Sequence, residues 1–363
     1  MSVLNPNTRT WTPAHQVDVG PSALGRYTRT VQVAITGDGI VHAVWGMSDP
    51  DFSDNDPPAG VWAAESRDYG MSWSAPQRIG DDCRKVNDAG ASLDGWLVVG
   101  LICNDGTEAV QPAIATRSPE GAWSLQRLPG ATWYFSDGAV ALAEDGDNLR
   151  ATVMFLSGPN GQVVPPPRLL LFSTTLGSGE PWQLSTRDID VPGVEEGSRA
   201  WHARALVYHL PGAATDSITL MFSDAARWNG YALTSQDAGR SWLAPELVVS
   251  PEGGGEQIAF AAPAYDATSN RLAAIYTCCA EGSWSNALPS THYLRWSTPG
   301  SGVWSEPIGD QRVPLVLGSR ATGETVTAQA RNARTTWVAW IEGGNAVEVR
   351  SFNLATVLPQ EGQ

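Results

Sequence analysis

Short hydrophobic runs recur along this chain, and several are followed by a second run of β-favouring residues and then by a polar turn. Apolar runs of this length, bounded by turn residues, are typical of buried β-strands. There are six of the first, hydrophobic runs: Ile40–Trp45, Trp96–Ile102, Leu149–Leu156, Ser217–Phe222, Arg271–Tyr276 and Thr335–Ile341. Three examples of the second run, which is rich in aromatic and aliphatic residues, are Val61–Ala64, Tyr231–Leu233 and Tyr293–Trp296.

The turns that follow these strands share a sequence pattern. Ser66–Trp73 and Ser235–Trp242 both read S-x-D-x-G-x-S-W, and Ser297–Trp304 keeps the spacing from Ser to Trp without the Asp. Ser118–Trp123 and Ser173–Trp182 are more degenerate copies. An Asp side chain accepts hydrogen bonds from nearby backbone amides, Gly adopts a positive φ, and Trp packs the turn onto the sheet. We therefore predict a structural turn at each copy.

The repeating unit is about 50 to 60 residues long, which in an all-β chain is the period of propeller blades. The sixth unit has its third strand at Ala346–Ser351 and then lacks a turn and a Trp strand, whereas Asn7–Pro13, with Trp11, resembles the missing piece. Such closure would remove the open sheet edges. The sequence thus predicts an all-β, six-bladed β-propeller of four-stranded blades. We expect one domain over residues 1–363, with an N-terminal strand at about residues 9–17 completing the last blade.

Charge and composition exclude several functions. The formal net charge of −15 argues against nucleic acid as a partner, although a local cationic pocket for a small acid remains compatible with it. No segment approaches the roughly 20 apolar residues that span a bilayer, so we expect no membrane insertion. We also expect a monomer. The first residues lack the basic and apolar regions of a secretory signal, which leaves a secreted and a cytoplasmic location both open.

The four cysteines lack the paired spacing of a structural zinc site. Cys83 and Cys103 are the better candidates for a disulfide. For the adjacent Cys278 and Cys279 we favour two buried free thiols over a vicinal disulfide.

The turn pattern matches the Asp box (BNR repeat), and the chain resembles the sialidase (neuraminidase)-like superfamily of six-bladed propellers. Sialidases open their first blade with Arg-Ile-Pro, a strand and an Asp-Gly turn, and Arg29–Gly39 has this layout with Thr-Val in place of Ile-Pro. The resemblance implies that Arg29 belongs to an arginine triad that binds the substrate carboxylate, for which a planar guanidinium is suited. The alternative is a structural arginine, salt-bridged at a strand end. Arg227 stands near the second arginine position, and His292 occupies the third.

The resemblance also implies a catalytic aspartate in the long acidic loop over residues 49–58, where Asp54 or Asp56 is the counterpart. The same loop suits a structural calcium ion, because closely spaced Asp and Asn oxygens bind hard cations. No other cofactor is implied. The family's nucleophilic tyrosine is absent near Glu324, and the glutamate that activates it is absent from residues 199–204. Glu324 is therefore a candidate nucleophile, and Glu324 or Asp137 a candidate base for an attacking water.

If the family's strand directions hold, the Asp-box turns occupy one face, and the first-strand starts and second-to-third-strand loops share the other. Cations, carboxylates and aromatics there suit an acidic sugar. We expect an exo-acting glycoside hydrolase. Two alternatives stay open: a lyase that uses His202 or His292 as base on a uronate polymer, and a non-catalytic lectin or adhesin. Besides the residues above, this face carries Arg26, Asp88, Arg204, Trp201, Trp228 and Trp284.

Overall fold

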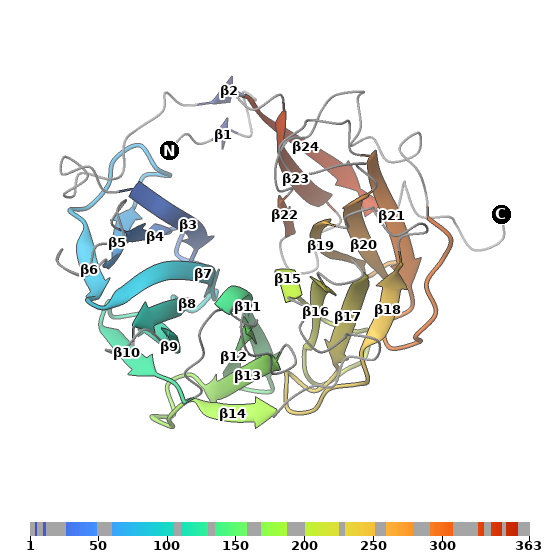
Figure 1. The fold of residues 1–363 in the computed structure, drawn as a ribbon, viewed down its shortest axis with the longest axis horizontal. Helices are drawn as coiled ribbons and strands as arrows, with labels where there is room; N and C mark the ends of the chain where they lie inside the picture. Colours follow the sequence, from blue (N-terminus) through green and yellow to red (C-terminus); the bar gives the residue numbers. More distant parts are fainter. Residues whose placement is uncertain are drawn as a thin grey trace, which may run out of the picture. The chain divides into compact units, whose positions relative to one another are not determined.

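The computed structural model describes residues 4–5, 10–11, 27–48, 60–104, 110–129, 135–157, 168–186, 200–224, 229–250, 259–278, 291–307, 326–329, 335–342 and 346–354. The regular elements of these residues are β-strands, and they form antiparallel sheets in which strands adjacent in sequence are neighbours (Figure 1). Within these ranges there is no helix long and apolar enough to cross a membrane.

The strands fall into successive sheets along the chain. The first has β3 (Tyr27–Ile35), β4 (Val41–Ser48), β5 (Val61–Ser66) and β6 (Gln77–Gly80), and the second has β7 (Cys83–Ala91), β8 (Leu97–Asn104), β9 (Val110–Arg117) and β10 (Trp123–Arg127). The third has β11 (Phe135–Asp145), β12 (Asn148–Ser157), β13 (Arg168–Thr175) and β14 (Gln183–Thr186), and the fourth has β15 (Ala200–Tyr208), β16 (Ser217–Asp224), β17 (Gly230–Ser235) and β18 (Glu246–Val249).

Two later sheets have three strands each within the described residues. These are β19 (Ala259–Asp266), β20 (Arg271–Cys278) and β21 (Thr291–Ser297), then β22 (Val326–Gln329), β23 (Thr335–Glu342) and β24 (Ala346–Asn353). At the N-terminus, β1 (Leu4–Asn5) pairs with β2 (Thr10–Trp11). The closure of the last sheet by the N-terminal segment, the number of blades and the single domain therefore stay predictions.

The predicted hydrophobic runs form the second strand of each sheet, β4, β8, β12, β16, β20 and β23. Each second strand lies between the first and third strands, so its backbone is paired on both edges. The described side chains of β8 show the consequence: Leu97 to Cys103 are all buried. A strand enclosed in this way needs apolar residues on both faces, which explains why these runs lack an alternating polar pattern.

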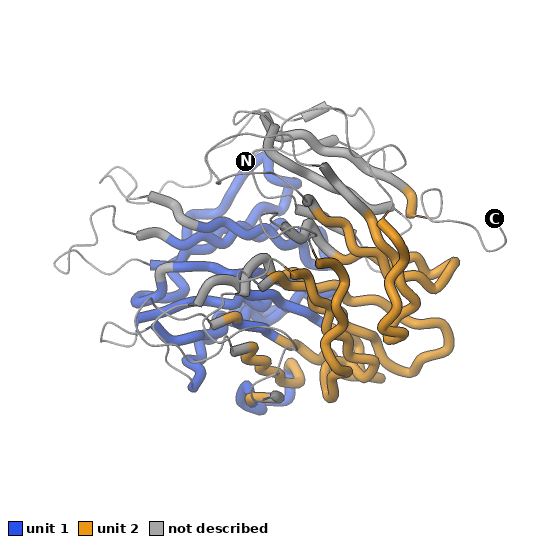
Figure 2. The backbone as a smooth tube through the Cα atoms, turned by 45° about the vertical axis from the view of Figure 1, so that its right-hand side comes forward, with its two compact units in different colours: residues 1–142, 153–155, 177–183 blue, residues 143–152, 156–176, 184–363 orange. Residues whose placement is uncertain are grey.

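The chain divides into two compact units (Figure 2). Unit 1 comprises residues 1–142, 153–155 and 177–183, and unit 2 comprises residues 143–152, 156–176 and 184–363. In unit 1, β3 and β4 contact β7, and in unit 2, β15 and β16 contact β19, which in turn contacts β22. First strands of successive sheets thus lie next to one another within each unit.

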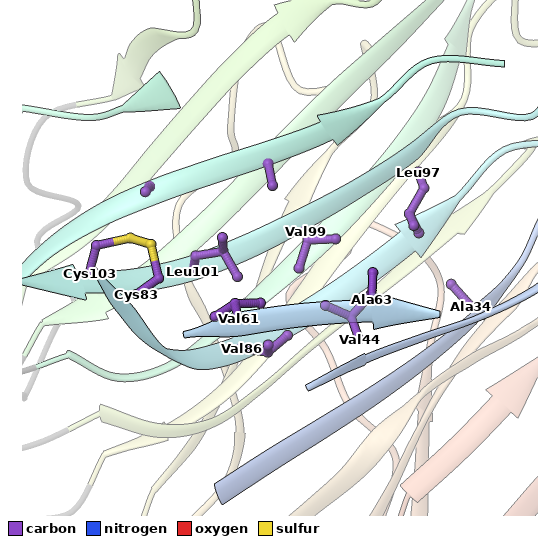
Figure 3. Close-up of a cluster of buried hydrophobic side chains, with 12 residues drawn as sticks. Ala34, Val44, Val61, Ala63, Cys83, Val86, Leu97, Val99, Leu101 and Cys103 are labelled. Atoms are coloured by element: carbon purple, nitrogen blue, oxygen red, sulfur yellow. A yellow bond between two sulfur atoms is a disulfide. The ribbon is translucent and has the colours of Figure 1, made fainter. Parts of the chain in front are cut away.

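The core of unit 1 lies between its first two sheets (Figure 3). Val44, Val61, Leu97 and Leu101 are fully buried there or nearly so. The predicted disulfide is confirmed: Cys83 and Cys103 are register partners in β7 and β8, and their sulfur atoms are bonded within this core. Cys278 ends β20, and Cys279 lies outside the described residues.

Both full copies of the turn pattern fold in the same way. Ser66 Oγ donates to Asp68 Oδ1 at 2.8 Å, and Ser72 donates to the Asp68 carboxylate through its amide at 2.8 Å and its hydroxyl at 2.6 Å. Ser235, Asp237 and Ser241 repeat these bonds at 2.8, 2.8 and 2.6 Å. The hydrogen bonds from Ser72 and Ser66 lower the pKa of Asp68 to about 2.

Candidate functional site

Each sheet has two ends, which we name the turn end and the loop end. The turn end carries the connections from the first to the second strand and from the third to the fourth, including the S-x-D-x-G-x-S-W turns. The loop end carries the start of the first strand and the connection from the second to the third. Register pairs fix this arrangement: Tyr27 at the start of β3 pairs with Ser48 at the end of β4, and Ala200 pairs with Asp224.

Several predicted site residues lie in described strands close to the loop end. Arg29 is in β3 and Asp137 is in β11, both in unit 1. In unit 2, Trp201, His202 and Arg204 are in β15, and His292 is in β21. The remaining predictions lie outside the described residues: Arg26, Asp54, Asp56, Arg227, Trp228, Trp284 and Glu324.

The first strands break register near the loop end. In β3 the register skips from Thr28 to Thr30, which leaves Arg29 as the unpaired residue of a β-bulge. In β15 the shift lies between Trp201 and Arg204, so His202 is also in a bulge. β-Bulges bend a strand and re-aim side chains, and they are common beside active sites. Two residues chosen from the sequence as site candidates therefore occupy irregular positions in the backbone.

A bulge in β7 identifies a further residue, Asn87, which the sequence did not single out. The register skips from Val86 to Asp88, so Asn87 is unpaired in the ladder. Its side chain is 4% exposed. Among the described residues, Asn87 is the one side chain with two buried polar atoms, Oδ1 and Nδ2, that have no hydrogen-bond partner. A polar residue inside a strand carries no sequence signal for such an environment, because the register shift is not visible in the pattern.

The neighbours of Asn87 hold its backbone in place. Val86 N donates to Thr30 Oγ1 of β3 at 2.9 Å, and Gln32 Nε2 donates to the Asn87 carbonyl at 3.2 Å. The carboxylate of Asp88 accepts hydrogen bonds from Ala89 N at 2.9 Å and Val140 N of β11 at 2.8 Å. Asp88, expected to line the site, therefore ties β7 to β11 through backbone amides.

Arg204 is the predicted substrate-binding residue whose side chain the structure describes. It follows the bulge in β15, and its Nη1 donates to the carbonyl of Ala203 at 2.7 Å. One guanidinium donor is thus engaged with the bulge itself, which stabilises the irregular backbone beside His202.

A buried polar cluster lies at the turn end of unit 1. His42 Nε2 lies 3.2 Å from Thr36 Oγ1, which donates to Asp38 Oδ1 at 2.6 Å, and Arg117 pairs with Glu65. Burial lowers the pKa of His42, and the nearby Glu65 only partly opposes this shift. Thr36 and His42 are 3% and 1% exposed, so the cluster is placed to support the turn rather than to meet a substrate.

The described residues include no group of three or more His, Cys, Asp or Glu side chains arranged to hold a metal ion. The acidic loop over residues 49–58, on which the calcium expectation rests, lies outside them. The calcium site therefore stays a prediction.

Comparison with solved structures identifies the fold. A protein of unknown function from Dyadobacter fermentans matches with a TM-score of 0.55 and 13% identity, over 90% of this chain and 94% of that chain. The K499G mutant of NanB sialidase from Streptococcus pneumoniae matches with a TM-score of 0.52 and 12% identity, over 92% of this chain and 69% of that chain. A structure of NanB with Optactamide matches with a TM-score of 0.51 and 12% identity, over 91% and 69%.

These likenesses, together with the successive four-stranded antiparallel sheets, show that the chain has a sialidase-like β-propeller fold. The resemblance inferred from the turns and Arg29 is thereby confirmed for the fold. No protein-family model matches the sequence, and no curated protein matches it either.

Proposed function

We propose that this protein binds an acidic sugar at the loop end of its sheets and acts on it as an exo-acting glycoside hydrolase. The observation that carries the proposal is the position of Arg29 and His202, each in a first-strand bulge near the loop end. Backbone irregularity has a cost, and it is retained where it places side chains for function.

The residue types suit an acidic ligand. A guanidinium binds a carboxylate through two parallel hydrogen bonds, which suits Arg29 to the sugar carboxylate. Trp201, Trp228 and Trp284 offer apolar ring faces to sugar C–H groups. In a chain with a net charge of −15, such a cationic site would also be the favoured location for an anion.

Hydrolysis needs a proton donor and a nucleophile. We assign Asp54 or Asp56 as the acid that protonates the glycosidic oxygen while the bond to the anomeric carbon breaks. In one route Glu324 attacks that carbon to form a glycosyl ester, and a water that gives its proton to the now ionised Asp54 or Asp56 then displaces Glu324 and releases the sugar. In the other route a water attacks the carbon while Glu324 or Asp137 takes its proton. Paired carboxyl groups are the usual solution in glycoside hydrolases. The fold shared with NanB sialidase supports a carbohydrate-active propeller and leaves the sugar open.

Three kinds of substrate distinguish the possible activities: aryl sialosides, other aryl glycosides and uronate polymers. Release of the free sugar from an aryl glycoside supports hydrolysis. An unsaturated product that absorbs in the ultraviolet would instead identify a lyase with His202 or His292 as base. Binding without any product would identify a lectin.

Arg29→Ala tests the binding role. Loss of a charge-assisted pair should weaken binding of an acidic glycoside roughly 10- to 100-fold, with Arg29→Lys intermediate. The control is Arg67→Ala, since Arg67 is a 74% exposed arginine at the turn end. Equal affinity in wild type and Arg29→Ala would remove Arg29 from the site. Unchanged turnover in Glu324→Gln would remove Glu324 from the chemistry.

A further inference from the structure

Buried ionisable groups join the first two sheets of unit 1 at the turn end. His42 of β4 is 1% exposed, and its register partner Glu65 in β5 pairs with Arg117 of β9, in the second sheet. Gly37, after β3, donates its amide hydrogen to the carbonyl of Ser92, after β7, at 3.0 Å. We name the Arg117–Glu65 pair and this hydrogen bond the joint, because both link the first sheet to the second.

The hydrogen bonds at His42 fix which nitrogen of the neutral ring carries a proton. Thr36 Oγ1 donates its hydrogen to Asp38 Oδ1 at 2.6 Å, so it accepts from His42 Nε2, which lies 3.2 Å away. Nδ1 is therefore the unprotonated nitrogen, and it faces Glu65 Oε1 at 4.0 Å. Acid would place the additional proton on Nδ1.

Charged groups face the His42 ring from the strands and turns around it. They are Glu65 of β5, Arg117 of β9, Asp38 of the turn between β3 and β4, and Arg67 of the turn after β5. Arg117 pairs with Glu65 through Oε1, the same atom that Nδ1 faces, and Arg67 Nη2 lies 3.8 Å from Oε2. The carboxylate thus already has two cations, and a protonated His42 would compete with Arg117 for one oxygen.

The second full copy of the turn motif shows that the turn does not need an ionisable pair at this place. Thr219 and Thr234 occupy the register positions that correspond to His42 and Glu65. They are 0% and 2% exposed, and their hydroxyl oxygens lie 3.1 Å apart. The motif at Ser235–Trp242 makes the same internal hydrogen bonds as the first, so the ionisable pair is an addition to the first copy.

The sign of the pH dependence follows from the burial of His42. Burial lowers the pKa of His42 below its ordinary value of 6.5, and Glu65 only partly opposes this. The unfolded chain, or an opened cluster, therefore takes up a proton first as the pH falls. The stability contributed by the neutral ring is complete above pH 6.5 and declines below it, until His42 is protonated in the folded state as well. A single proton changes the opening equilibrium by at most about tenfold per pH unit.

We propose that His42 is an acid-sensitive switch: uptake of a proton at Nδ1 opens the joint and releases the first turn motif, Ser66–Trp73, from the second sheet. The motif follows directly on Glu65, and the Ser74 amide beyond it donates to the Glu65 carbonyl at 2.8 Å. Loss of the Arg117–Glu65 pair therefore acts at the base of the motif. The switch lies at the turn end and does not depend on the proposed function.

The test compares wild type with His42→Gln, which keeps a donor for Thr36 and does not titrate. The measurement is hydrogen exchange of the Gly37 amide at pH 7 and pH 5, each corrected for the intrinsic exchange rate. Protection of this amide should fall about tenfold in wild type and stay within twofold in His42→Gln. Protection of the Gly239 amide, which donates to Ser235 Oγ in the second motif, should be the same at both pH values.

His209→Gln is the matched control, because His209 Nδ1 also lies beside a carboxylate, at 3.1 Å from Asp216 Oδ1, but in unit 2 and 37% exposed. It should keep the wild-type pH dependence at Gly37. Equal protection of Gly37 at both pH values in wild type, or the same fall in His42→Gln, would overturn the switch. Should His42→Gln not fold, the ring protons of His42 in wild type decide by nuclear magnetic resonance. Their titration midpoint should lie below 6.5, and a midpoint at or above 6.5 would also overturn the proposal.

Discussion

The turn end and the loop end of the sheets are built on different principles. At the turn end, short motifs satisfy their own polar groups, as Asp68 and Asp237 do with three hydrogen bonds each from neighbouring serines. Near the loop end, first strands lose register at Arg29 and His202, and a bulge in the middle of β7 leaves the Asn87 amide without a partner among the described residues. Sequence-local bonding thus supports the scaffold at one end, and irregular backbone presents side chains at the other.

The largest expected effect concerns the disulfide, which lies at the loop end and therefore tests how separate the two ends are. Replacing Cys83 and Cys103 together by Ala should lower the free energy of unfolding by about 3 kcal/mol, because the bond closes a loop of 20 residues and both cysteines are fully buried. Urea unfolding measures this change. Because Cys83 and Cys103 lie at the loop end, ligand affinity should fall as well; loss of stability with unchanged affinity would show that the loop end keeps its arrangement without the disulfide.

Next in size is Gly239 in the second turn. It has a φ of +84°, and a Cβ there would lie 2.6 Å from Thr152 Oγ1. Gly239→Ala should cost about 2–3 kcal/mol, through backbone strain plus this contact. Gly212→Ala is the control, because Gly212 has a φ of +77° with no atom nearby and should cost only about 1 kcal/mol. Thermal unfolding compares the two. An equal loss of stability in the two variants would mean that Thr152 moves aside. Reduced ligand affinity in either variant would contradict the division between a structural turn end and a ligand-binding loop end.

Asp237→Ala should have a moderate effect, about 1–2 kcal/mol, because two hydroxyls and one amide lose their acceptor. Burial alone would raise the pKa of Asp237, but hydrogen bonds from Ser241 and Ser235 outweigh it and lower the pKa. The stability from this carboxylate is therefore present above its ordinary pKa of 3.8 and is lost as the pH falls through the lowered value. Unfolding measured between pH 5 and pH 2 should show a shallower acid loss in Asp237→Ala than in wild type. Parallel curves would show that this carboxylate contributes nothing to the pH dependence.

The smallest expected effect is at Glu246, which joins two sheets of unit 2 at the turn end. Its carboxylate accepts hydrogen bonds from Gly302 N at 3.1 Å and Trp304 Nε1 at 3.3 Å, while burial raises its pKa above the ordinary 4.5. The contribution is therefore complete below pH 4.5 and declines as the pH rises through the raised value. Glu246→Gln should remove this decline, but its amide nitrogen cannot accept one of the two hydrogen bonds, so the variant should be less stable than wild type by about 0.5–1 kcal/mol at pH 4 and by less at pH 7. Denaturant midpoints at pH 4 and pH 7 measure it, and an equal deficit at the two pH values would contradict the raised pKa of Glu246.

The regular parts of the fold could be predicted from the sequence because they depend on short patterns. The run over Trp96–Ile102 indicates an enclosed strand, and the repeated turns identify the blade unit from Ser66–Trp73 and Ser235–Trp242 alone. The pairing of Cys83 with Cys103 could also be predicted from the sequence, and the two residues are register partners in the structure.

The candidate site was harder to predict from the sequence, for a physical reason. A bulge is one additional residue in a strand, and the residue pattern around Asn87 does not reveal it. Contacts between distant segments, such as Arg117 with Glu65 and Asp88 with Val140, are likewise absent from any local pattern. Arg29 could be selected because its whole neighbourhood resembles a family motif, whereas Asp54 and Glu324 lie outside the described residues and remain predictions.

The self-contained turns also have a consequence for how the chain folds. Each S-x-D-x-G-x-S-W turn makes its hydrogen bonds within eight residues, so its formation requires little loop closure. We expect these turns to form early and to bring the third strand beside the place of the fourth before neighbouring sheets meet. Substitutions in the turns should then slow refolding, whereas changes at Arg29 or Asn87 should leave the refolding rate unaltered.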